Sequence, residues 1–211
     1  MILKPVEWNT VVVGSWNPAI LTPQGIADIL FKKPADVPVE IMVPLDGIGP
    51  PRVGIDEQIV TVELGRLVVE SKKPEWSGLE QSRRIVLNAI EGLPRTPLSA
   101  AGFNVRYCLE GVAAELIELF ETKFDALLSD AMIKILGREM RRSLEFNNGI
   151  INVHITGFDS TKYNVLMNFE KQSKATKDLV DWLNTGIESV KDIVRKILQD
   201  VLKISKEEIP E

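Results

Sequence analysis

Short runs of alternating apolar and polar residues in the first half of the chain predict β-strands. Residues 10–16 and 39–43 are rich in β-branched side chains, and between them Thr22 and Pro23 favour the start of a short helix over residues 23–31. Three further strands are predicted, at residues 52–55, 58–64 and 66–72. Because tight turns join them, these three strands must run antiparallel.

Two helix signals follow this meander. Ser77 and Glu80 have the spacing of a capping box, so we expect a helix to begin there and to end near Gly92 and Pro94. Its core-facing side is an apolar stripe formed by Leu79, Val86, Ile90 and Leu93.

The second half repeats this order of elements. Residues 101–109 predict a strand, and residues 112–136 have the spacing of a long helix with a possible bend near Thr122. Asn148 and Gly149 predict a hairpin turn, since both central residues of a type I′ turn need positive φ. A second turn is expected at 159–160. A helix over residues 175–203, with one continuous apolar stripe, would be roughly 40 Å long.

The repeated order suggests one domain, residues 1–211, built of two similar halves at about 1–95 and 96–211. In both halves a strand with a glutamate (Glu70, Glu170) leads through a lysine-bearing linker into an amphipathic helix. Chance similarity of two strand–helix units is the alternative explanation. Duplication predicts that the halves share a core.

These elements predict an α+β fold with a curved antiparallel sheet and helices on one face, because each late helix has one apolar side. Strand–helix–meander–helix order is typical of helix-grip and saddle-like folds, including the duplicated saddle of the TATA-binding protein. The comparison concerns architecture and implies no function.

Composition narrows the range of functions. The chain has 45% hydrophobic residues and a net charge of −5, which argues against a dedicated nucleic-acid binder. A single cysteine, Cys108, excludes an intramolecular disulfide and fits a cytoplasmic protein. The first ten residues lack the apolar core of a signal peptide, and no run is long enough for a membrane span.

Two segments resemble those of a group of uncharacterised bacterial proteins of about this length and element order. The first is "GSWNPAILTP", with the N-P-A-I residues at 17–20 followed by Pro23, and the second is "TPLSAAGFNVRY", with Thr96, Pro97 and the G-F-N residues at 102–104. The resemblance implies the order of elements and brings no activity and no site residue.

The sequence offers no catalytic, metal or cofactor motif. His154 is the only histidine and lies within a strand pattern, so we expect a hydrogen-bonded sheet residue rather than a ligand or triad base. Cys108 is interpreted as a buried small hydrophobe. The glycine-rich segment "DGIGPPRVG" matches no phosphate-binding pattern and is interpreted as a loop.

Three residues are candidates for binding. Arg106 alternates with Val105 and Tyr107, so its side chain should point to the free face of the sheet if its neighbours face the helices. Trp16 and Asn17 close the first strand, where a core-edge indole and an asparagine bonded to its own turn are the structural alternatives.

The favoured function is a non-enzymatic interaction or assembly module that binds a protein partner, or itself, through a sheet face or edge. The alternative is a helix-grip protein with a small ligand under the C-terminal helix, near Met167, Phe169 and Trp182. An enzyme using carboxylates, Arg106 or a borrowed metal remains a third hypothesis, without a motif to support it.

Overall fold

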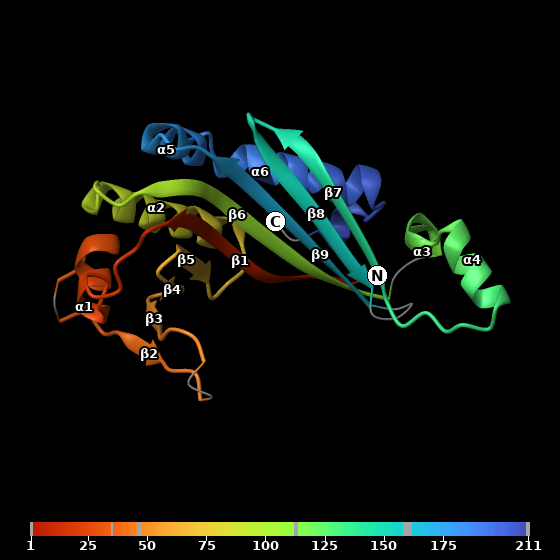
Figure 1. Cartoon of the computed structure of the whole chain (residues 1–211), viewed down its shortest axis with the longest axis horizontal. Helices are drawn as coiled ribbons and strands as arrows, with labels where there is room; N and C mark the ends of the chain where they lie inside the picture. The colour runs from red at the N-terminus through yellow and green to blue at the C-terminus, as the bar shows by residue number, and fades with distance from the viewer. Residues whose placement is uncertain (1, 35, 46–47, 112–113, 158–161, 210–211) are drawn as a thin grey trace.

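Alternating apolar residues build one antiparallel sheet of nine strands in the part of the chain that the structure describes, and the sheet is open. The structure is a computed structural model, and it describes residues 2–34, 36–45, 48–111, 114–157 and 162–209 (Figure 1). The strands are β1 (Ile2–Gly14), β2 (Glu40–Met42), β3 (Arg52–Ile55), β4 (Gln58–Val62), β5 (Arg66–Ser71), β6 (Leu98–Glu110), β7 (Arg138–Phe146), β8 (Gly149–Gly157) and β9 (Lys162–Gln172).

Helical segments connect and cover these strands. They are α1 (Pro23–Gly25), α2 (Trp76–Gly92), α3 (Ala114–Phe120), α4 (Lys123–Asp130), α5 (Thr176–Asn184) and α6 (Ile187–Lys196), with π-helical turns at Ile26–Leu30 and Ile197–Val201 and a short 3₁₀ turn at Lys206–Glu208.

The two longest strands, β1 and β6, pair antiparallel at the centre of the sheet. Strand order across the sheet is β2-β3-β4-β5-β1-β6-β9-β8-β7. From β1 outward the order is β5, β4, β3, and from β6 outward it is β9, β8, β7. The last strand of each meander therefore pairs with the first strand of its own half, and β2 is the additional strand in the first half.

Helices α2 and α5 pack on the same face of this sheet (Figure 1). Thr10 on β1 and Phe103 on β6 are direct partners, so their side chains share a face. Thr10 Oγ1 lies 2.7 Å from Oγ of Ser82 on α2, and the Phe103 ring stacks on Trp182 of α5 with centroids 5.6 Å apart. One apolar core therefore lies between the sheet and these helices.

Several local predictions are confirmed. Oγ1 of Thr22 accepts a hydrogen bond from Gly25 N, capping α1 as expected. The bend expected near Thr122 is present: α3 ends at Phe120, and Thr122 caps α4 in a capping box with Asp125. Helix α4 ends at Asp130, earlier than the predicted end at residue 136. A polar cap in mid-stretch thus separates two short helices.

Other predictions were wrong in detail. The helix begins at Trp76, so Ser77 lies inside it and donates to Glu75 instead of forming a capping box with Glu80. The hairpin turn is Asn147–Asn148, one residue earlier than predicted, and Gly149 already belongs to β8. The expected turn at 159–160 lies outside the described residues.

The C-terminal helix is not continuous. It breaks between α5 and α6 at Gly186, whose φ of 104° lies outside the helical region. Buried apolar residues continue on both sides of the break, so the sequence pattern did not reveal it. Helix α5 packs on β6 and β9, and after the break α6 packs against α2.

Candidate functional site

The open face of the sheet, the one opposite α2 and α5, carries the main polar features. Along β6, Val105 and Tyr107 are fully buried on the helix side, whereas Asn104, Arg106 and Cys108 point the other way and are half-buried. The predicted direction of the Arg106 side chain is thus confirmed. Cys108, expected to be buried, lies on this half-exposed face.

A row of hydrogen-bonded side chains crosses five strands of the open face. Ser143 Oγ donates to Asn152 Oδ1 at 2.7 Å, and Asn152 Nδ2 to Asn168 Oδ1 at 3.2 Å. Asn168 Nδ2 donates to Asn104 Oδ1 at 2.9 Å, and Asn104 Nδ2 to Asn9 Oδ1 at 2.8 Å. Consecutive members are direct cross-strand partners. We call these five residues the asparagine row.

The row ends on β1 at a charged pair. Asn9 Nδ2 donates to Oε1 of Glu7 at 3.1 Å, and the other carboxylate oxygen lies 2.9 Å from Nη1 of Arg106. Glu7 and Arg106 are themselves partners across the β1–β6 pair. Arg106 therefore fixes the carboxylate that the last amide of the row bonds to.

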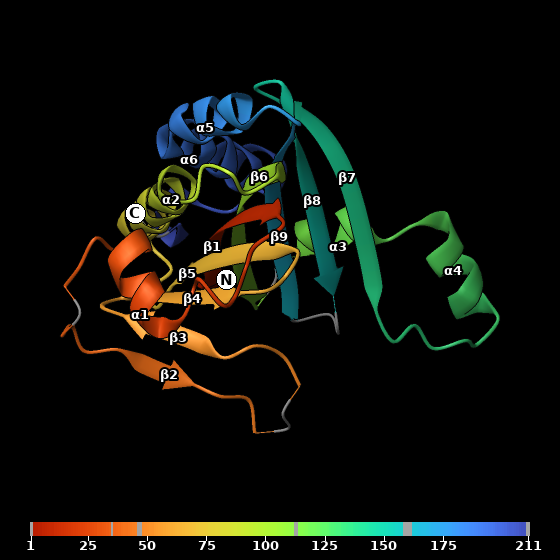
Figure 2. The ribbon, with the colours of Figure 1, turned by 60° about the vertical axis from the view of Figure 1, so that its left-hand side comes forward.

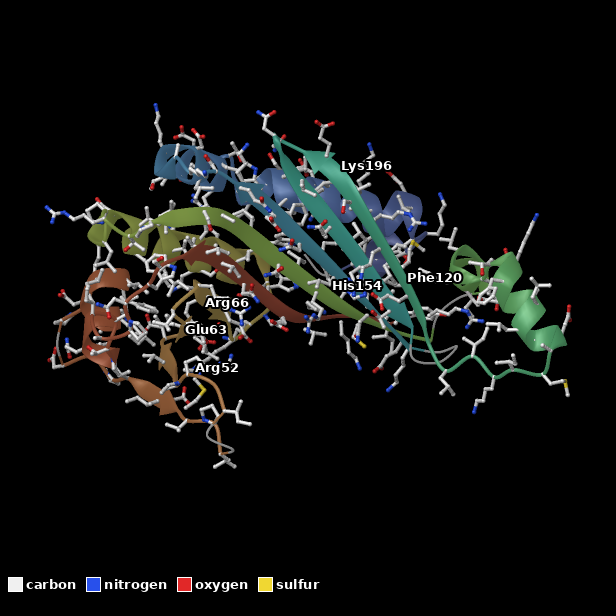
Figure 3. The ribbon with its side chains drawn as sticks, in the orientation of Figure 1. Arg52, Glu63, Arg66, Phe120, His154 and Lys196 are labelled. Atoms are coloured by element: carbon white, nitrogen blue, oxygen red, sulfur yellow. The ribbon has the colours of Figure 1, made fainter. Side chains whose placement is uncertain are left out.

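Beside this end of the row, the open face is hollowed into a polar basin of about 410 Å³. Its walls come from strands β1, β3, β4, β5 and β6, and from the turn after β4. The lining residues are Glu7, Asn9, Val11, Arg52, Thr61, Glu63, Arg66, Val68, Glu70 and Asn104. Figure 3 shows Arg52, Glu63 and Arg66 close together on this side of the sheet.

Ion pairs line the basin and its rim. Arg52 Nη2 lies 2.5 Å from Glu70 Oε2, and Arg66 Nη2 lies 2.8 Å from Glu63 Oε1. Burial raises the pKa of the Glu70 carboxyl, and the charge of Arg52 opposes that rise. Together with the pair between Glu7 and Arg106, three positive and three negative groups balance here. A ligand suited to this basin needs both donors and acceptors.

The three predicted binding residues do not form one site. Arg106 lies in mid-strand beside the basin, roughly 27 Å along β6 from the β1 end where Trp16 and Asn17 follow. Trp16 is 2% exposed and its Nε1 donates to Val12 O, so the indole belongs to the core. Asn17 is exposed and its Oδ1 accepts from Ala19 N, which makes the turn expected as the structural alternative. Their binding role stays a prediction.

The two segments that carry the family resemblance lie side by side. Ser15 N donates to Pro97 O at 2.9 Å, just where the β1–β6 pair ends. Next to the first segment is an apolar cavity of about 580 Å³, which we call the proline pocket. Its lining residues are Pro18, Leu21, Thr22, Pro23, Ile26, Ile41, Pro50, Pro51, Val53, Val62, Glu63 and Leu64.

The expected ligand cavity under the C-terminal helix coincides with packed core. Met167 and Phe169 are fully buried, and Trp182 is 5% exposed with its ring stacked on Phe103. These side chains fill space between the sheet and α5. His154, as predicted, is a hydrogen-bonded sheet residue, with Nε2 at 3.1 Å from Thr156 Oγ1 and 2.9 Å from Glu139 Oε1.

The two edges of the sheet differ strongly. The edge strand β2 has three residues and lies between Pro38 and Pro44, which cannot donate to a further strand. The other edge, β7, has nine residues in unbroken register with β8. Its central residues 141–145 are all exposed. Figure 2 shows β7 at the margin of the sheet, with α4 standing away from it.

The sequence analysis missed the asparagine row, although the chain contains a signal for it. Asparagine is depleted from strands. Here it stands mid-strand between hydrophobic or β-branched residues five times. Four of these triplets supply the row, namely Trp-Asn-Thr, Phe-Asn-Val, Ile-Asn-Val and Met-Asn-Phe at 8–10, 103–105, 151–153 and 167–169, and the fifth, Tyr-Asn-Val at 163–165, lies outside it. Four such triplets in four strands indicate one shared polar line across a sheet.

Comparison of the sequence with protein-family models and with curated proteins found no match. Within the described residues, no helix is both long and apolar enough to cross a membrane. In the same part of the chain, no three histidine, cysteine or carboxylate side chains are grouped as metal ligands would be. Inference about function therefore starts from the sheet surface itself.

Proposed function

We propose that the protein is a non-enzymatic assembly module that binds protein through the edge or the open face of its sheet, and above all binds a second copy of itself. The observation that carries the proposal is the exposed run 141–145 on β7. An edge strand offers a row of backbone donors and acceptors that another strand can pair with. Such pairing is a common mode of protein recognition.

The contrast between the two edges supports this reading. Proteins that must stay monomeric blunt their edges with short strands, proline or bulges. The β2 edge has two of these features, a short strand and flanking prolines. The β7 edge is long, regular and free of proline. Its helix-side surface also leaves Leu144 41% exposed.

A duplicated saddle-like architecture is part of the same proposal. The matching strand order on the two sides of the β1–β6 pair supports a repeat of halves 1–95 and 96–211. In this arrangement helices cover one face, and the asparagine row and polar basin lie on the other. The open face then adds a hydrogen-bonding surface to the edge, suited to a polar protein partner.

Size-exclusion chromatography with light scattering tests the proposal. We expect a dimer or larger species whose share grows as the concentration rises from low micromolar to near millimolar. A single monomeric species across that whole range would contradict self-association. Protein refolded from denaturant should give the same result as freshly purified protein.

A small-ligand binder is the second candidate, and the proline pocket favours it. A volume of about 580 Å³ lies within the range of about 300–1,000 Å³ typical of ligand sites, and apolar residues dominate its walls. Native mass spectrometry of freshly purified protein checks for a bound molecule. A mass equal to the bare chain under gentle and denaturing conditions alike would count against this candidate.

A further inference from the structure

We infer that two copies of the chain pair through β7 in one register, antiparallel about a two-fold axis at Ser143. The inference rests on the proposed self-association, and it adds which strand, which orientation and which residues meet. Several conditions must hold together: backbone groups must point outward, side-chain charges must complement each other, and apolar side chains must find contacts.

The turn of the β7–β8 hairpin determines which backbone groups point outward. Asn147 and Asn148 both have positive φ, 45° and 58°, as in a two-residue type I′ turn. In such a hairpin the flanking residues, Phe146 and Gly149, exchange backbone hydrogen bonds, and pairing then alternates along the ladder. Residues 140, 142 and 144 therefore bond to β8, while 139, 141, 143 and 145 direct N–H and C=O outward.

A two-fold axis of an antiparallel pair can pass through an outward-directed residue or through a residue that bonds to β8. Among the residues that bond to β8, an axis at Arg142 would pair two arginines, an axis at Met140 would set Arg138 opposite Arg142, and an axis at Leu144 would leave Arg141 and Glu145 without an opposite charge across the pair.

The four outward-directed residues remain as positions for the axis. At Glu139, Arg141 or Glu145 it would place two identical charges directly opposite each other, which destabilises a strand pair. At Ser143 the axis brings two neutral hydroxyl residues together. The same register places Arg141 opposite Glu145 of the second copy, and it does so twice.

Accessibility fits this register. The Arg141 side chain is 73% exposed, Ser143 and Glu145 are exposed, and all three side chains lie on the open face. Arg141 already bonds Glu139 on its own strand, so its guanidinium lies along this face of the edge. The planar guanidinium group of an arginine has enough N–H donors to hydrogen-bond to two carboxylates at once.

The helix side of the edge is complementary as well. In this register Met140 lies opposite Phe146 of the second copy, and Arg142 lies opposite its Leu144. Met140 and Phe146 are half-buried within one copy, and Leu144 is 41% exposed. Pairing would cover these apolar side chains, and the stem of Arg142 can lie over the Leu144 side chain.

The asparagine row ends at this axis. Ser143 is the outermost member of the row, and its Oγ donates inward to Asn152. Two copies would bring both rows together at the paired serines and give one polar line across both sheets. The open faces would then form one continuous surface, with one polar basin on each side.

Cysteine cross-linking tests the register. In a Cys108→Ser background, Ser143→Cys should form a disulfide-linked dimer under mild oxidation, because directly paired residues have Cα atoms about 5.5 Å apart, within disulfide reach. Glu145→Cys is the matched control. Its symmetry mate would lie about 13 Å away along the strand, so it should stay uncross-linked. Equal cross-linking of both variants would overturn the inference.

Charge reversal gives a second readout. Arg141→Glu alone should weaken dimerisation roughly tenfold, since two attractive pairs become repulsive. The double variant Arg141→Glu with Glu145→Arg should restore the dimer. If the dimer forms but ignores both the cysteine and the charge variants, self-association stands and this register is wrong. If the chain is monomeric throughout, both proposals fail.

Discussion

The side-chain amide of Asn104 on β6 donates to Oδ1 of Asn9 on β1 at 2.8 Å, across the central strand pair. Asn104 also accepts from Asn168 Nδ2, so it lies within the asparagine row, between Asn168 and Asn9. Asn104→Ala should lower the free energy of unfolding by about 1–2 kcal/mol, because it removes two half-buried hydrogen bonds. Urea unfolding followed by circular dichroism measures the change.

The matched control is Asn164→Ala. Asn164 lies on the same face of β9, four residues from the row's Asn168, and is also half-buried. We expect a loss within about 0.5 kcal/mol there. Equal losses for the two variants would show that the row adds nothing beyond ordinary strand packing.

Gly102 on β6 allows β6 and β9 to approach each other closely. A Cβ at this position would lie 2.2 Å from the carbonyl oxygen of Phe169, a backbone atom that cannot move aside alone. Gly102→Ala should therefore destabilise the fold by at least about 2 kcal/mol. Gly65→Ala is the control, because a Cβ there meets nothing within 4 Å. Thermal unfolding of both variants tests the difference.

A carboxylate on α2 should make stability depend on pH. Glu80 Oε1 lies 2.6 Å from Arg83 Nη2 and 3.0 Å from Arg84 Nε, and the hydrogen bond from Arg83 lowers the pKa of Glu80 most. Because the folded pKa is depressed, this stabilisation is present above the unfolded value of about 4.3 and is lost as the pH falls below it.

Glu80→Gln isolates that contribution. The wild type should exceed the variant by less than about 1 kcal/mol at neutral pH, since the pair is partly exposed. The gap should shrink in acid, as measured by urea unfolding at a series of pH values. A gap that stays constant down to the lowest pH at which the protein is folded would contradict the pKa assignment.

Phe120 attaches the α3–α4 arm to the sheet. Its ring stacks on Tyr163 of β9 with centroids 5.1 Å apart, and it is 7% exposed. Phe120→Ala should release the arm, so trypsin should cleave at Lys123 and Lys134 several-fold faster while the core stays folded. Phe124→Ala, at a ring already 65% exposed, should leave the cleavage rate unchanged.

The sequence predicted strands and helices where one local pattern decides the structure. The meander at 52–72 and the cap at Thr22 follow from alternation and from a hydroxyl that bonds its own turn. The helix break at Gly186 was not predicted, because the apolar stripe continues through it. Such a stripe indicates which side of a segment is buried, and it does not show where the backbone changes direction. The prediction of an α+β fold with one antiparallel sheet is confirmed.

The candidate site was less accessible to sequence reasoning. The side that Arg106 faces follows from alternation, but its partner Glu7 lies far away in the sequence and depends on the β1–β6 register. Register also decides that four asparagines form one row. The apolar neighbours of each asparagine indicate which face of the sheet it takes. Which asparagines come to lie opposite one another depends on the pairing of strands that are far apart in the sequence.

The asparagine row has a direction. Every member donates toward β1, and the final amide proton meets the negative charge of Glu7. If one inner amide were turned around, its Nδ2 would face the Nδ2 of one neighbour and its Oδ1 would face the Oδ1 of the other. The amides therefore keep a common orientation. The row therefore joins Ser143 at the rim of the sheet to Glu7 near its middle, about 19 Å apart across four inter-strand spacings, through one chain of hydrogen bonds that all point the same way.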